Sequence, residues 1–152
     1  FILSNPPFMP SPPGAAEHYF HSGGGGLLGM DFLERILAWL DDHLAVGGRA
    51  QFVTAAPGDA ELPTALIELL ERHLRGAATL VVDPLRLPFD DLAHHPAPRG
   101  LSAAAMTAAT HELQASGISH EYLCVLHYAA DAPRGLSVEQ CAAHPAWDQP
   151  LP

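Results

Sequence analysis

Apolar residues recur along this chain with two different periods. In residues 31–44 they fall at three- and four-residue steps, which places them on one face of a helix. The same steps run through residues 66–74, and Pro63 falls in the first turn of that helix, where a missing N–H does no harm. The pattern therefore predicts two amphipathic helices. We expect Gly47-Gly48 to end the first and Gly76 the second, because glycine adopts the left-handed conformation cheaply.

Short apolar runs lie before and between the predicted helices. Residues 1–4 are typical of the end of a buried strand, and residues 49–54 of a short strand. Residues 78–84 form a continuous apolar run bounded by glycine and proline, as expected of a strand covered on both faces. We interpret Asp83-Pro84 as the turn that ends this strand rather than as a second catalytic motif.

The rest of the pattern completes an alternation of strands and helices. We expect an alanine-rich helix between Ser102, as its N-cap, and Gly117, and then a strand over residues 121–130. Residues 1–130 thus predict one α/β domain, a layered sheet with right-handed crossovers. Residues 131–152 are expected to be an irregular C-terminal tail.

The totals fit one packed domain and disfavour several kinds of partner. The 152 residues carry 7 Lys plus Arg against 17 Asp plus Glu, a formal charge of −10, which disfavours binding to a phosphate backbone. No apolar run has the roughly 20 residues of a membrane span, and no signal peptide is visible. Two cysteines cannot build a disulfide framework, so we expect a cytoplasmic protein. Cys124, within an apolar run, is interpreted as a small core residue rather than a nucleophile.

Residues 5–8, Asn-Pro-Pro-Phe, directly follow the first predicted strand and carry the candidate chemistry. Two prolines cannot continue a sheet ladder or enter a helix, so the chain must turn out of the sheet there. The Asn5 amide oxygen and the Pro6 carbonyl are two acceptors on a stiff backbone, and together they can grip an NH₂ group. Phe8 adds a flat apolar wall on which a planar amide or a base can stack. An ordinary strand-to-loop turn is the alternative.

These residues and the segments after them resemble the class I S-adenosylmethionine-dependent methyltransferases whose fourth strand ends in (N/D)PP(Y/F). The likeness is to the release-factor glutamine methyltransferase and small-domain methyltransferase groups in particular. In those groups the motif is followed by a loop, a segment like GG-x-D-G-L-D-F, a helix and a strand introduced by PGG. This chain has GGLLGMDF at residues 25–32 and VGGRA at residues 46–50. The match covers about the first 85 residues well, and the later elements follow the family's order more loosely.

The resemblance implies the C-terminal half of a Rossmann-like class I methyltransferase sheet, with the last strand antiparallel between its neighbours. It implies S-adenosyl-L-methionine as the cofactor and methylation of a nitrogen on a protein side chain or a small molecule. Asn5 and Pro6 would then be the catalytic pair that orients the accepting nitrogen, and Asn5 would also contact the cofactor. Pro7 and Phe8 would pack against the substrate.

The chain also departs from the family's pattern. Leu28 replaces the acidic residue of GG-x-D-G. The family's glycine-rich cofactor turn and its acidic ribose-binding residue both precede the Asn-Pro-Pro-Phe motif, and neither is found here; Gly23–Gly26 follows a loop rather than a strand and is interpreted as a flexible loop. We therefore expect the main cofactor site upstream of this chain. A missing N-terminal segment or another chain should lie beside residues 1–4, because they would otherwise expose an apolar sheet edge.

Ten histidines raise the question of a metal site, but no carboxylate or cysteine completes a recognised zinc pattern, so we expect none. In the resembled family the loop after the motif lies over the substrate, which makes His18, Tyr19 and His21 candidates for substrate contact. Packing within the loop is the alternative. His127, within the last predicted strand, is interpreted as a satisfied sheet histidine.

Two functions remain open at this level. The first is nitrogen methylation by direct attack on the cofactor's methyl group, without metal or covalent intermediate. The second is a non-catalytic, truncated methyltransferase-like module with a binding or structural role. The feature that separates them is whether a strand, a glycine-rich turn and an acidic residue precede residue 1 in the parent protein.

Overall fold

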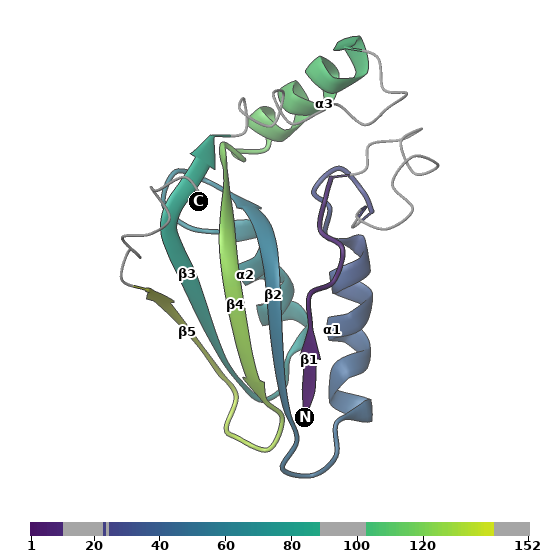
Figure 1. Cartoon of the computed structure of the whole chain (residues 1–152), viewed down its shortest axis with the longest axis vertical. Helices are drawn as coiled ribbons and strands as arrows, with labels where there is room; N and C mark the ends of the chain where they lie inside the picture. The colour runs from purple at the N-terminus through teal and green to yellow at the C-terminus, as the bar shows by residue number, and fades with distance from the viewer. Residues whose placement is uncertain (11–22, 24, 89–102, 142–152) are drawn as a thin grey trace, which may run out of the picture.

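In the computed structural model, a mixed α/β fold is built around a five-stranded sheet of order β1-β2-β4-β3-β5 (Figure 1). The structure describes residues 1–10, 23, 25–88 and 103–141. The strands are β1 (Ile2–Ser4), β2 (Arg49–Gly58), β3 (Ala77–Pro88), β4 (His120–Ala129) and β5 (Gly135–Gln140). The helices are α1 (Asp31–His43), α2 (Thr64–His73) and α3 (Ala103–Ala115).

The sheet combines parallel and antiparallel pairs. β1 runs parallel to β2, β4 lies antiparallel between β2 and β3, and β5 runs parallel to β3 at the far edge. The antiparallel placement expected for the strand over residues 121–130 is thus confirmed. The expectation that this is the last strand is wrong, because the supposedly irregular tail contains β5. Its side chains are mostly exposed, so pairing with the β3 backbone holds it and no apolar pattern reveals it.

One face of the sheet carries the core. Helices α1 and α2 pack on this face through three buried leucines each: Leu33, Leu37 and Leu40, and Leu66, Leu69 and Leu70. They meet Phe52, Leu80 and Leu126 of the sheet. Both helices predicted from the apolar period are confirmed.

The glycines do not end these helices directly. α1 ends at His43 and α2 at His73, because Leu44 and Leu74 already adopt extended backbone conformations as C-caps. Gly47, at φ +74°, instead forms the turn that leads into β2.

β3 differs from the strand that its apolar run predicts. Burial alternates along its first half, so it is covered by the helices on one face and only half-buried on the other. The strand also continues past Asp83-Pro84, where the register shifts between Val82 and Arg86. Asp83 stabilises this bulge by accepting a hydrogen bond from the Leu85 N–H at 2.8 Å. The predicted strand end is therefore a bulge.

The arrangement of strands and helices identifies one end of the sheet as the candidate site. Figure 1 shows α3 beyond the upper ends of β3 and β4, at the opposite end of the molecule from the N-terminus. The carboxyl ends of the parallel strands β1, β2 and β3 lie at this same end, together with the N-terminal ends of α1 and α2. None of the described helices is long and apolar enough to cross a membrane.

Candidate functional site

The Asn-Pro-Pro-Phe motif begins where β1 ends. β1 pairs with β2 from Ile2 to Ser4, and the prolines then take the chain out of the ladder as predicted. The Asn5 side chain is exposed and Pro6 is buried, while Phe8 is half-buried. Within the described part of the chain, no hydrogen bond engages the Asn5 amide or the Pro6 carbonyl. The exposed Asn5 amide is therefore available to a ligand, whereas the unbonded Pro6 carbonyl belongs to a buried residue.

A glycine turn holds the motif from one side. Gly29 has φ +70°, and a Cβ at this position would lie only 2.1 Å from the Phe8 carbonyl oxygen. An isolated β-bridge between Met9 and Gly23 is a second contact between the end of the motif and the glycine-rich segment. The segment GGLLGMDF thus fixes the backbone of the motif by direct packing, a role that its sequence alone did not reveal. Leu28, which replaces an acidic residue of the resembled pattern, packs against the core instead.

The substrate-contact candidates on the loop cannot be placed. His18, Tyr19 and His21 lie outside the described residues. Of the predicted site residues, the structure brings together Asn5, Pro6, Pro7 and Phe8, which are consecutive in the chain.

Two turns of the described chain each surround a carboxylate of the chain itself. Gly25 and Gly26 fold around the Asp31 side chain, since a Cβ on Gly26 would lie 2.4 Å from Asp31 Oδ1. In the turn from β2 to α2, Asp59 Oδ1 accepts the N–H groups of Glu61 and Leu62 at 2.8 and 2.9 Å. The N–H group of Glu61, and then that of Leu62, hold the pKa of Asp59 below its ordinary value. Side chains of the chain itself therefore occupy both turns.

The other side chains that could carry chemistry lie in environments typical of structural residues. Burial raises the pKa of the Cys124 thiol to about 12, so it is protonated at neutral pH and is a core residue, as predicted. No three His, Cys, Asp or Glu side chains gather to hold a metal ion within the described ranges. His127 lies within β4, as predicted, and its side chain is exposed.

No described strand covers the edge of the sheet next to the motif. β1 stands at the end of the strand order and pairs with β2 alone among the described strands. The flanking side chains Phe1 and Leu3 are 81% and 68% exposed. An apolar edge strand with unpaired backbone groups is what natural sheets normally cover.

In comparisons with known proteins, no family model matches the chain and no curated protein matches it significantly.

Proposed function

We propose that this chain is the acceptor-holding part of an S-adenosylmethionine-dependent methyltransferase that methylates nitrogen, on a protein side-chain amide or on a small molecule. The observation that carries the proposal is the pair of unengaged acceptors, Asn5 and the Pro6 carbonyl, at the carboxyl end of a parallel strand. The strand arrangement supports it, because β4 lies antiparallel between β2 and β3 as in the C-terminal half of a Rossmann-like class I methyltransferase sheet.

The proposed chemistry is positioning rather than acid–base catalysis. S-Adenosyl-L-methionine, when bound, supplies an electrophilic methyl group. The Asn5 amide oxygen and the Pro6 carbonyl each accept one N–H of the substrate, which leaves the nitrogen lone pair directed outward. Pro7 keeps the backbone stiff, and Phe8 packs against the planar group that carries the nitrogen. Correct orientation of the nitrogen is most of what this attack requires.

The cofactor-binding half must come from outside the described residues. We place it beside residues 1–4, as a preceding segment of the same protein or as another chain, where it would cover Phe1 and Leu3 and extend the sheet. We also propose a cytoplasmic location. Nucleic acid is the less favoured acceptor, because the chain's formal charge of −10 disfavours binding to a phosphate backbone.

Calorimetry of the whole gene product with S-adenosylhomocysteine tests the proposal. We expect saturable binding by the whole gene product and none by residues 1–152 alone. A folded gene product that binds no S-adenosylhomocysteine would exclude the enzyme.

That outcome would favour the second candidate, a non-catalytic methyltransferase-like module. The specific observation in its favour is that Asp31 and Asp59 fill the turns where a cofactor would need free N–H groups. Such a module would use its open edge and its pockets for binding alone.

A further inference from the structure

A pocket of about 480 Å³ lies between the N-terminal part of α1, the length of α2 and the C-terminal half of α3. Its volume falls within the roughly 300–1,000 Å³ typical of small-molecule sites. Met30, Leu69 and Leu113 supply apolar lining, each from a different element or its flank. Three elements far apart in sequence thus line one half-open space that accepts an apolar group.

The polar lining of this pocket is strongly acidic. The carboxylates of Asp31, Glu34, Glu68 and Glu112 all border it, against one basic residue, Arg72, among the described lining. Arg72 is already paired with Glu34 Oε1 at 2.9 Å, and His73 Nε2 lies 2.9 Å from the same oxygen. Within the described part of the chain, Asp31, Glu68 and Glu112 have no ion-pair partner. The pocket therefore carries negative charge that the described residues do not compensate.

The apolar lining strengthens the electrostatic effect of these carboxylates on a ligand in the pocket. Asp31, Glu68 and Glu112 are exposed, so solvent screens part of their charge, but the apolar lining beside them still directs their field into the pocket, which attracts cations and repels anions. A charged N–H donor bonded to a carboxylate is also stronger than a neutral hydrogen bond. Both effects require that the ligand bring its charge together with an apolar body that displaces water from Met30, Leu69 and Leu113.

We propose that this pocket binds an organic cation, an ammonium or guanidinium group joined to an apolar body. The cation lies between Glu68 of α2 and Glu112 of α3, and the body contacts the apolar lining. A free amine and a lysine side chain of a peptide present the same chemistry. The inference does not depend on methyl transfer.

The pocket shares one turn with the packing of the Asn-Pro-Pro-Phe motif. Leu28 and Met30 line it, and Gly29 between them packs on the Phe8 carbonyl. An occupant of the pocket thus rests on the same turn that holds the motif in place.

Calorimetry on residues 1–152 tests the inference with 4-phenylbutylamine as the probe. Its uncharged counterpart 4-phenylbutanol should bind about tenfold more weakly or worse, because it lacks the charge. The double variant Glu68→Gln, Glu112→Gln should weaken amine binding about tenfold and leave alcohol binding nearly unchanged. Glu71→Gln is the matched control: it removes one carboxylate from an exposed site on α2 outside this pocket, and amine binding should stay within about twofold of wild type.

Two further arms complete the experiment. Raising the salt concentration should weaken the amine and leave the alcohol unaffected. An acetylated, amidated lysine-leucine peptide is compared with the amine: tighter binding of the peptide assigns the site to a polypeptide ligand, and tighter binding of the amine assigns it to a small molecule. The inference is overturned if the alcohol binds as well as the amine, if the double variant binds the amine normally, or if no binding of the amine is detected at millimolar concentration.

Discussion

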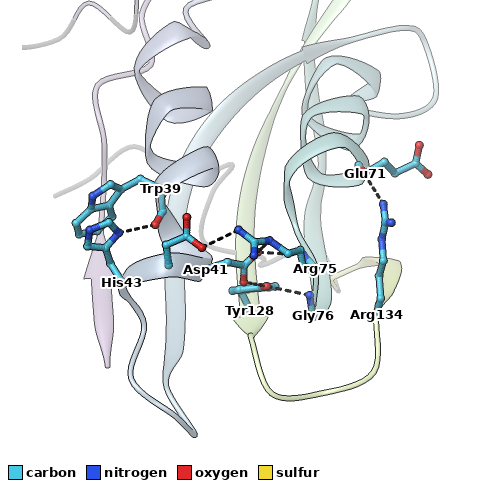
Figure 2. Close-up of polar contacts among 9 residues, drawn as sticks. Trp39, Asp41, His43, Glu71, Arg75, Gly76, Tyr128 and Arg134 are labelled. Atoms are coloured by element: carbon cyan, nitrogen blue, oxygen red, sulfur yellow. Dashed lines mark hydrogen bonds and ion pairs between the residues drawn. The ribbon is translucent and has the colours of Figure 1, made fainter.

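Tyr128 joins three elements through one hydroxyl group (Figure 2). It donates to Asp41 Oδ1 of α1 and accepts the N–H of Gly76, at the start of β3, at 2.9 Å. The other Asp41 oxygen accepts the Arg75 N–H at 3.1 Å. The Asp41 side chain is only 7% exposed, so these hydrogen bonds replace its lost hydration.

Tyr128→Phe should therefore destabilise the fold. The change leaves the buried Asp41 carboxylate and the Gly76 N–H short of a partner, and we expect a loss of about 1–3 kcal/mol in the free energy of unfolding, measured with urea. Tyr122→Phe is the control, because its hydroxyl donates to the neutral carbonyl of Asp59 at 2.8 Å and its charged neighbour, Arg86, is exposed and keeps its hydration. A larger loss for Tyr122→Phe than for Tyr128→Phe would contradict this account.

Glu121 is a buried carboxyl group in β4, 8% exposed. Burial raises its pKa above the ordinary 4.5, so the folded state holds this proton more tightly than the unfolded state. Such a group contributes stability that is full below pH 4.5 and is lost as the pH rises through its folded pKa.

Glu121→Gln should accordingly stabilise the protein at neutral pH, where it removes a buried charge, and bring little gain below pH 4.5. Urea unfolding of both proteins across this pH range measures the difference. An equal effect at both ends of the range would mean that the charge of Glu121 has no part in it. Glu139→Gln, at an exposed position of β5, should show no such pH dependence.

At the scale of elements, the turn over residues 25–30 links the motif to α1. Its contact with Phe8 depends on Gly29, which has both a positive φ and no room for a Cβ. Gly47 has a similar φ, +74° against +70°, but nothing lies within 4 Å of its Cβ position. Comparing alanine substitutions at these two glycines therefore separates the cost of the positive φ from the cost of a clash with Phe8.

Gly47→Ala should cost about 1 kcal/mol of stability, the price of the left-handed conformation alone. Gly29→Ala should cost about 1–3 kcal/mol more, because the added methyl group pushes on the Phe8 carbonyl. Chemical unfolding gives both values, and NMR shifts at Phe8 should move only in Gly29→Ala. Equal costs would show that the turn does not clamp the motif.

Local patterns predicted those elements that bury one continuous apolar stripe. The leucines of α1 and α2 recur with the helical period because both helices cover the same sheet face. β5 escaped prediction since it is held by backbone pairing, and the β3 bulge escaped because Asp83-Pro84 also signals a turn. The acidic pocket has no local signal at all, since its carboxylates converge from residues 31, 34, 68 and 112 only after folding.

At the scale of the whole molecule, the described sheet ends on one side at β1, an apolar edge that no other described strand covers. An uncovered edge of this kind tends to pair with another edge. We expect residues 1–152, purified alone, to self-associate, and Leu3→Lys to reduce the association measured by sedimentation velocity. Val46→Lys, at a fully exposed position between α1 and β2, should leave it unchanged. A monomer at all concentrations would argue against an exposed pairing edge.

The central claim is that Asn5 and the Pro6 carbonyl hold a substrate nitrogen for methylation. It is tested most directly with radiolabelled S-adenosylmethionine, the whole gene product, and a panel of glutamine-containing peptides and small amides. Asn5→Ala should reduce methyl transfer about tenfold or more and leave S-adenosylhomocysteine affinity nearly unchanged, whereas Asn5→Asp, which keeps an acceptor, should retain more activity. Equal methyl transfer by wild type and Asn5→Ala, or no transfer to any acceptor, would contradict the account.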